Sequence, residues 1–227
     1  KVAGAILGAF QGLVSKERVM ASSHDSVPAM VFSGQRRDGR GTYVYLETLG
    51  GGNGARYDSD GMDGIHVHIS NTSNLPAEAL EHEYDLLVDE YAFVEDSGGA
   101  GRHRGGCGLA RQIRVLTDGI IFSVRSDSHI VTAPGVFGGC DGHTARLVQN
   151  HGRPDEQLLG SKVAHIEMKS GESMRIETGG GGGYGPPSER SLPLLAVDVR
   201  GGKMSRPSAE RDYGAKMVLA ALDEKGT

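Results

Sequence analysis

The sequence has little of what would mark a disulfide-stabilised, membrane-spanning or nucleic-acid-binding protein. It has two cysteines and no tryptophan among 227 residues, so we expect no disulfide framework and a reducing compartment, the cytoplasm. No apolar run approaches the roughly 18 residues of a membrane span. The formal net charge of −5 argues against the broad basic face that nucleic acid requires. These absences favour a cytoplasmic protein whose partners are neither membrane nor nucleic acid.

The sequence also lacks an initiating methionine, because its first residue is Lys1. We therefore expect the chain to be processed, cut or only part of a gene product. Glycine, in contrast, is abundant: 36 residues, about twice the usual share. The glycines follow no period of three, which excludes collagen. They gather at 50–54, 98–108, 138–142 and 179–185, and such clusters predict loops with unusual backbone angles.

Helical spacing of apolar residues occurs near both ends of the chain. Residues 2–13 place four apolar side chains on one face, namely Val2, Ile6, Phe10 and Leu13. A short helix is predicted over 75–83, with Pro76 near its first turn. Residues 205–224 predict a helix with Ser205 or Arg206 near its cap and Pro207 in its first turn.

Alternation of period two predicts strands through most of the remaining chain. Strands are expected at 42–51, 64–70, 86–95 and 194–202. Hairpins are expected over 111–127, around Asp118-Gly119, and over 162–178, around residues 169–172. No regular β-α-β alternation is present, which disfavours a doubly wound nucleotide fold. We predict an α+β fold over 1–227, a single domain that is predominantly antiparallel β with Gly-rich loops and short flanking helices.

The glycine-rich stretch DSGGAGRHRGGCGLARQ (96–112) raises the question of phosphate binding. A P-loop requires Gly-x-x-x-x-Gly-Lys followed by Ser or Thr, and that string is absent. The stretch leads into a strand-like pattern rather than a helix, so nucleotide binding is disfavoured. Two interpretations stay open: a wide turn in which Arg102 and Arg104 pair with nearby carboxylates, or a loop whose arginines face another protein chain or an anionic substrate.

Other polar residues form three candidate groups. His66 and His68 lie two apart on a predicted strand, which is metal-ligand geometry, and Asp60, Asp63 or Asn71 could complete the set. The alternative without a metal is that the two histidines only form hydrogen bonds on an exposed or interface strand. Glu78 and Glu81 share one helical face, as an acid/base pair or as solvated surface.

The third group is the string ETGGGGGYGPPSER (177–190). Five glycines followed by Tyr184 and a rigid Gly-Pro-Pro turn indicate a backbone that passes close to a ligand or another chain. A serine nucleophile in a Gly-x-Ser-x-Gly elbow is excluded, because that string does not occur.

Four blocks, in this order, resemble the hydantoinase B/oxoprolinase family: ETLGGGNGAR (47–56), DGMDGIHVHISNTSNLPAEALEHEY (60–84), DSGGAGRHRGGCGLAR (96–111) and ETGGGGGYGPPSER (177–190). The resemblance covers nearly the whole chain. The family's metal-binding segment has no counterpart in this sequence. The resemblance therefore implies the C-terminal part of a B-type subunit. That lowers the expectation of a metal at His66 and His68, and we predict no metal ligand in this chain.

The resemblance further implies an ATP-dependent cyclic amidohydrolase that works as a complex. An A-type partner would use ATP and Mg²⁺ to phosphorylate a lactam or imide oxygen. The N-terminal half of the B-type polypeptide would hold a divalent metal, Zn or Mn. On this interpretation the isolated chain binds no cofactor of its own and is inactive. The same blocks also serve ATP-dependent acetone and acetophenone carboxylases, and a non-catalytic structural module is the third alternative.

By motif position, the resemblance implies two sets of site residues. The predicted catalytic residues are His66, His68, Glu78 and Glu81. The residues predicted to contact the substrate or an interface are Asn71, Asp96, Arg102, Arg104 and Tyr184.

Overall fold

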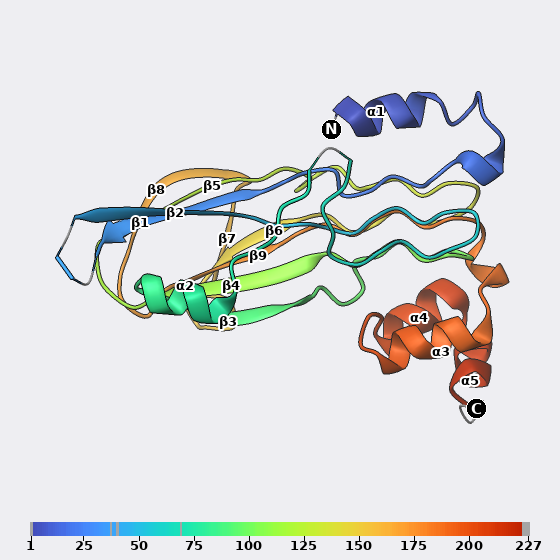
Figure 1. Cartoon of the computed structure of the whole chain (residues 1–227). Helices are drawn as coiled ribbons and strands as arrows, with labels where there is room; N and C mark the ends of the chain where they lie inside the picture. Colours follow the sequence, from blue (N-terminus) through green and yellow to red (C-terminus); the bar gives the residue numbers. More distant parts are fainter. Residues whose placement is uncertain (1, 37, 40, 69, 224–227) are drawn as a thin grey trace.

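Two antiparallel sheets form one end of the molecule in this computed structural model (Figure 1). The structure describes residues 2–36, 38–39, 41–68 and 70–223. One sheet has the strand order β2-β1-β5-β8, with β1 (Ala29–Gln35), β2 (Thr42–Thr48), β5 (Ile120–Arg125) and β8 (Lys162–Met168). The other has the order β3-β4-β9-β6-β7, with β3 (Leu86–Phe93), β4 (Leu109–Val115), β6 (Arg146–Gln149), β7 (Gln157–Leu159) and β9 (Ser173–Glu177). The predominantly antiparallel α+β prediction is confirmed.

A shared apolar core lies between the two sheets. Alternate residues of β2, including Tyr43 and Tyr45, are buried while their neighbours are exposed, as expected of a sheet with one covered face. Phe32 and Phe122 from one sheet belong to the same buried cluster as Ile176 from the other. Helix α2 (Ala77–Glu83) confirms the helix predicted at 75–83, and its Leu80 is buried in this core.

The two predicted hairpins are wrong, because each turn carries the chain from one sheet to the other. Strands β4 and β5, on either side of Asp118-Gly119, lie in different sheets, and so do β8 and β9. The turns themselves form: Gly119 has a φ of 78° and Gly171 a φ of 89°. They also bind each other, since the Ser170 amide donates to Asp118 Oδ1 at 2.8 Å. A turn signal fixes the local reversal but not the partner of the next strand.

A cluster of three short helices lies at the other end of the molecule (Figure 1), comprising α3 (Leu192–Arg200), α4 (Arg206–Tyr213) and α5 (Ala215–Asp223). The predicted strand at 194–202 is therefore wrong. A proline in the first turn favours the helix, and α3 buries Leu195 and Asp198. The cap predicted at Ser205 is confirmed, because its side chain accepts a hydrogen bond from the Ser208 amide. Gly214, with a φ of 90°, separates α4 from α5.

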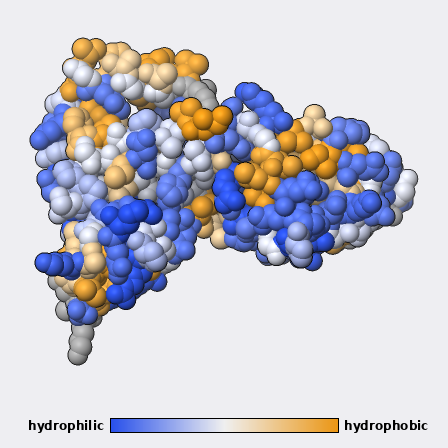
Figure 2. Space-filling model, turned by 180° about the vertical axis from the view of Figure 1, so that it is seen from behind, coloured by the Kyte–Doolittle hydropathy of each residue, from blue (hydrophilic) through white to orange (hydrophobic). Residues whose placement is uncertain are grey.

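Helix α1 (Val2–Ala9) is shorter than the predicted helix, and none of its residues is buried. Its apolar side chains contribute to an exposed apolar surface, and Val2 is 77% exposed. Seen from behind, apolar side chains gather both at this edge and over the sheet end (Figure 2). No described helix is long and apolar enough to cross a membrane.

The strand predicted at 64–70 does not form over its described residues, and residue 69 lies outside them. Ile65 makes only an isolated bridge with Gly51. His68 has a φ of 57°, which departs from the backbone of a regular strand. The alternating pattern thus belongs to an irregular segment.

Candidate functional site

Three glycine-rich segments, 50–55, 97–108 and 179–185, lie against one another between the sheets and the helices; we call them the glycine bundle. They are extended but outside the regular strands. Their backbones are joined by direct hydrogen bonds: Gly52 N to Gly179 O at 3.0 Å, Gly106 N to Asn53 O at 2.8 Å and Gly181 N to Gly106 O at 2.9 Å. The three segments therefore form one hydrogen-bonded unit although they are far apart in the sequence.

At glycine positions inside the bundle there is no room for a side chain. A Cβ added at Gly105 would lie 1.9 Å from Gly181 O, and one added at Gly180 would lie 1.8 Å from Ser97 O. Glycine is required here because backbones approach closer than any other residue permits.

The same packing answers the question raised by residues 96–112. Within the loop, the Gly99 amide donates to Gly181 O and the Gly106 amide to Asn53 O, while the Gly108 amide donates to Ser97 Oγ. A phosphate cradle needs amides that point at the ligand. These amides already donate to protein atoms in a packed bundle, so the residues present do not fit an ATP phosphate.

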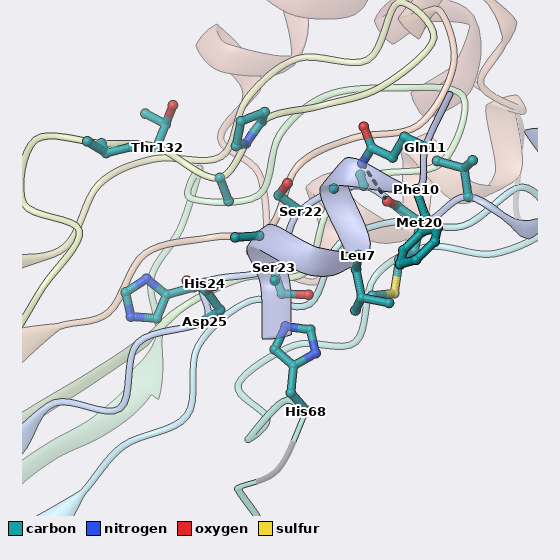
Figure 3. A pocket seen from close by; sticks show the side chains of 18 of the residues that line it. Leu7, Phe10, Gln11, Met20, Ser22, Ser23, His24, Asp25, His68 and Thr132 are labelled. Atoms are coloured by element: carbon teal, nitrogen blue, oxygen red, sulfur yellow. Dashed lines mark hydrogen bonds between the residues drawn. The ribbon is translucent and has the colours of Figure 1, made fainter. Parts of the chain in front are cut away.

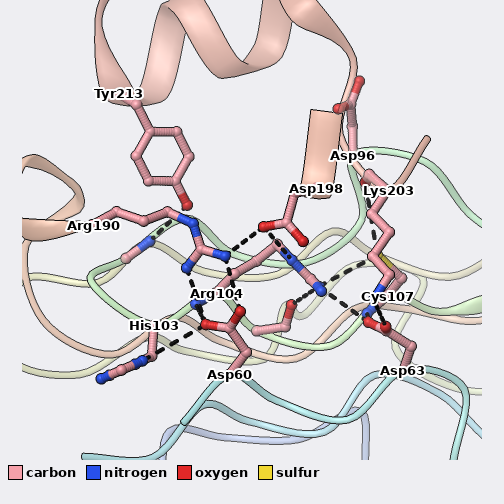
Figure 4. Close-up of polar contacts among 12 residues, drawn as sticks. Asp60, Asp63, Asp96, His103, Arg104, Cys107, Arg190, Asp198, Lys203 and Tyr213 are labelled. Atoms are coloured by element: carbon pink, nitrogen blue, oxygen red, sulfur yellow. Dashed lines mark hydrogen bonds and ion pairs between the residues drawn. The ribbon is translucent and has the colours of Figure 1, made fainter. Parts of the chain in front are cut away.

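A buried network of charges joins the bundle to the helices (Figure 4). The Arg104 side chain is 2% exposed and contacts Asp63 at 3.1 Å and Asp198 of α3 at 3.2 Å. Arg190 contacts the same Asp198 and, at 2.8 Å, Asp60. The pairing of Arg104 with carboxylates, one of the two predicted alternatives, is confirmed.

The positive charges of this network lower the pKa of two of its carboxyl groups, Asp60 and Asp63. Burial alone would raise the pKa of Asp60, but the hydrogen bond and charge of Arg190 outweigh it and lower the pKa below 3.8. For Asp63, burial is likewise outweighed by Arg104 and by Lys203, whose Nζ lies 2.8 Å away. Burial raises the pKa of the neighbouring Cys107 thiol to about 11, so this thiol is protonated and inert.

A second buried ion pair, missed in the sequence, secures the segment that carries the histidines. Arg111 Nε donates to Glu47 Oε2 at 2.8 Å. Asn74 donates to Glu47 at 2.8 Å and to Thr48 O at 2.7 Å, and it accepts a hydrogen bond from the Tyr91 hydroxyl. The last asparagine of the NTSN string is therefore a structural anchor. Glu47 lies in one of the four family blocks, but only the fold reveals its partner.

A cavity of about 550 Å³ lies beside α1 (Figure 3). One wall is apolar and comes from α1 and the turn after it, with Leu7, Phe10 and Val14. Polar residues also line the cavity. Its lining includes Ser22, Ser23, His24, Asp25, His68, Thr132 and His143.

Glycines shape the contact between α1 and this cavity. A Cβ added at Gly4 would lie 2.4 Å from Asp25 Oδ2 and 3.6 Å from His68 Nε2. Gly8 also lines the cavity, yet a Cβ added there would meet no atom within 4 Å. The helix therefore rests on polar residues at Gly4 and leaves open space at Gly8.

The predicted catalytic residues are not brought together. His68 lines the cavity. His66 does not; its ring nitrogens are buried with no hydrogen-bond partner among the described residues, and burial lowers its pKa. Glu78 is exposed on α2, which lies at the sheet end, away from α1 (Figure 1). Glu81 accepts a hydrogen bond from the Val88 amide at 3.0 Å, tying α2 to β3.

The residues predicted to contact a substrate or an interface mostly stabilise the fold. Asp96 accepts hydrogen bonds from the Ser205 amide and hydroxyl, both at 2.7 Å, and so anchors the start of α4. The Arg102 guanidinium lies over the rings of Tyr57 and Tyr184, at 5.1 and 5.7 Å. The Tyr184 hydroxyl donates to Lys16 O. Asn71 is exposed and lines no part of the cavity.

The described residues contain no group of three or more His, Cys, Asp and Glu placed to hold a metal. Asp60 and Asp63, which the sequence offered as partners for the histidines, pair with Arg190 and Arg104 instead. His24, Asp25 and His143 on the cavity were missed. The string SSHDS (22–26) is a polar run between apolar segments, and that is the signal that could have found the first two.

Two solved structures share the fold, an arrangement of antiparallel sheets seen in ATP-dependent enzymes. Nucleotide-free acetone carboxylase matches with a TM-score of 0.73 and 17% identity, over 94% of this chain and 34% of that chain. ATP-dependent caprolactamase from Pseudomonas jessenii matches with a TM-score of 0.71 and 24% identity, over 92% of this chain and 38% of that chain.

The chain belongs to the hydantoinase B/oxoprolinase family, whose sequence model matches residues 1–187. It is 37% identical to the uncharacterized protein MJ0963 of Methanocaldococcus jannaschii over 89% of this chain and 34% of that protein. It is 32% identical to the B-type subunit of a putative D-/L-hydantoinase from a Pseudomonas species, over 85% of this chain and 32% of that protein. The chain thus spans about one third of the length of these curated relatives.

Proposed function

We propose that this chain is the C-terminal part of a B-type subunit in an ATP-dependent complex that opens a cyclic amide or imide. The observation that carries the proposal is the family match over residues 1–187. The similarity to a putative D-/L-hydantoinase supports it, and so does the fold shared with a caprolactamase. A cytoplasmic location, favoured by the cysteine usage, is part of the proposal.

In this proposal, the phosphoryl chemistry takes place on another chain of the complex. Most amides of residues 96–108 already donate to other protein atoms, which supports an ATP and Mg²⁺ site on an A-type partner. That partner would transfer the γ-phosphoryl group of ATP to the amide oxygen and release ADP. Water would then add to the activated carbon, and the ring C–N bond would break as the nitrogen takes a proton, leaving an acyl phosphate. A second water would release inorganic phosphate and the carboxylate. The divalent metal, Zn or Mn, would be held by the N-terminal half of the B-type polypeptide.

The contribution of this chain would be the cavity beside α1. Asp25 and His68 line this cavity, and carboxylate and imidazole side chains are common general acids and bases in enzymes. The apolar side chains of Leu7, Phe10 and Val14 would contact the apolar part of the bound ring. We propose Asp25 and His68 as the polar residues that contact the substrate from this chain.

The predicted residues outside the cavity remain proposals, and Glu78 gives the sharpest test. Because Glu78 is exposed, a role in turnover requires that another part of the complex cover α2. We expect Glu78→Gln in the complete complex to lower turnover while ATP affinity is unchanged. Glu210→Gln on α4, also at a helix surface, is the matched control. Unchanged turnover in Glu78→Gln would remove that residue from the site.

A related carboxylase is the second candidate function, because acetone carboxylase shares the fold. One experiment separates the two. The complete complex, purified from its own source, is incubated with ATP and either a cyclic amide (hydantoin, 5-oxoproline or caprolactam) or acetone with bicarbonate. ADP release coupled to ring opening is the expected result. ADP release coupled only to ketone carboxylation would overturn the hydrolase assignment. If the complex catalyses neither reaction, the remaining assignment is a non-catalytic structural module.

A further inference from the structure

We propose that Gly8 of α1 sets the size of the substituent that the substrate ring can carry. The proposal rests on the proposed function, because it takes the cavity beside α1 to be where a cyclic amide binds. Gly8 would then determine specificity by facing the substituent of the ring rather than its amide group.

The size of the cavity is the first argument. Its volume of about 550 Å³ is in the range that holds a drug-sized ligand, roughly 300 to 1,000 Å³. A bare five-membered ring would leave much of that space unfilled. The cavity therefore suits a ring that carries a further group.

The polarity of the cavity gives the orientation. Asp25 and His68 line the cavity near Gly4, whereas the apolar side chains of Leu7, Phe10 and Val14 line it from α1 and the turn after it. Hydrogen-bonding groups of the ring gain most against the polar residues, since an unpaired buried amide is costly. An apolar substituent gains most against α1. The ligand class is therefore a cyclic amide or imide with an apolar substituent.

The spacing of glycines along α1 singles out Gly8. Asp25 leaves no space for a side chain at Gly4, because a Cβ there would lie 2.4 Å from the carboxylate. Gly12, one turn beyond Gly8, is not part of the cavity lining. Gly8 alone of the three combines a place in the lining with open space for a side chain. A larger residue at Gly8 would extend into the volume that the substituent needs.

The test is equilibrium binding to the complete complex in the absence of ATP, so that no turnover occurs. The probes are hydantoin and 5-benzylhydantoin, which share the ring and differ in the apolar group. In Gly8→Leu we expect the affinity for 5-benzylhydantoin to fall about tenfold or more and that for hydantoin by less than about threefold. Gly12→Leu, also free of contacts within 4 Å, should change neither. Both variants should fold: leucine favours helix over glycine at Gly8, and Gly12, in the turn after α1, has open space for a side chain and no positive φ.

The outcomes separate this inference from the proposed function. Equal loss of both probes, no change of either, or the same selectivity change in Gly12→Leu would overturn the role of Gly8. Failure of the wild-type complex to bind either probe would overturn it as well. If the wild type opens cyclic amides while Gly8→Leu shows no selective loss, only this inference fails. If the wild type opens none, the proposed function fails, even where selective binding supports the cavity.

Discussion

Glycine serves opposite purposes in the glycine bundle and in α1. In the bundle, a Cβ at Gly181 would lie 2.0 Å from Asn53 O, a backbone atom. In α1, a Cβ at Gly8 would meet nothing within 4 Å. The first glycine permits backbones to touch, and the second leaves a space empty. The comparison teaches that glycine content alone does not separate a packed scaffold from an open site.

The largest expected effect comes from adding a methyl group at a glycine of the bundle. Gly181→Ala forces a methyl group into the Asn53 carbonyl, which neither backbone can avoid without losing hydrogen bonds. We expect it to destabilise the protein by about 4 kcal/mol or more, enough to unfold a protein of ordinary stability. Thermal unfolding and soluble yield of the complete polypeptide measure the effect.

Gly8→Ala is the matched control, because it replaces the same residue type with the same methyl group. It should be neutral or stabilise the helix by about 0.5–1 kcal/mol. Similar melting temperatures for Gly181→Ala and Gly8→Ala would contradict the contrast between the two regions.

The next effect concerns the charges that join the bundle to the helices. Asp198→Asn removes the carboxylate that two buried arginines share, Arg104 and Arg190. We expect a loss of about 3 kcal/mol, because breaking a buried ion pair leaves an uncompensated charge. Limited proteolysis should then release α3–α5 first. Asp212→Asn, whose partner Arg211 is exposed, should cost less than about 0.5 kcal/mol, and equal effects would argue against the network.

Acid should weaken the same junction. The pKa values of Asp60 and Asp63 lie below 3.8 in the folded protein. A carboxyl whose pKa is lowered by folding stabilises the protein above its unfolded pKa, and this contribution is lost as pH falls through the folded value. The melting temperature should therefore drop as pH falls below 3.8. An Asp60→Asn/Asp63→Asn variant should show a shallower drop over that interval, and an unchanged slope would be the opposing result.

More of the fold than of the site could be predicted from the sequence, because many helices and strands follow from local signals. Alternation at 42–51 and helical spacing at 75–83 are local signals, and β2 and α2 form there. The run LLAVDVR resembles a strand by its β-branched residues, yet it forms α3 because Asp198 meets Arg104 and Arg190 across the fold. Strand partners at 118–119 were likewise set by long-range pairing.

The site was less predictable, because motif position does not reveal where a side chain lies. Arg104 and Asp96 stand in the family blocks, but they pair with Asp63 and Ser205 and hold the structure together. Asp25 stands in none of those blocks and lines the cavity. Only His68 was both predicted and found there.

The smallest effect distinguishes the two cysteines without changing the fold. Cys107 is buried beside Arg104 with a pKa raised to about 11, whereas Cys140 is exposed. A thiol reagent at about pH 8 should label Cys140 in the native chain and both cysteines after unfolding. Peptide mass mapping identifies the labelled residue, and rapid native labelling of Cys107 would show that the bundle opens.

The most direct test of the central claim is a structure of the complete complex with a cyclic amide and a non-hydrolysable ATP analogue. The account predicts the ring in the cavity beside α1, within reach of Asp25 and His68, and the nucleotide on another chain. A ring bound elsewhere while protein fills this cavity, or a nucleotide phosphate on residues 96–112, would contradict it.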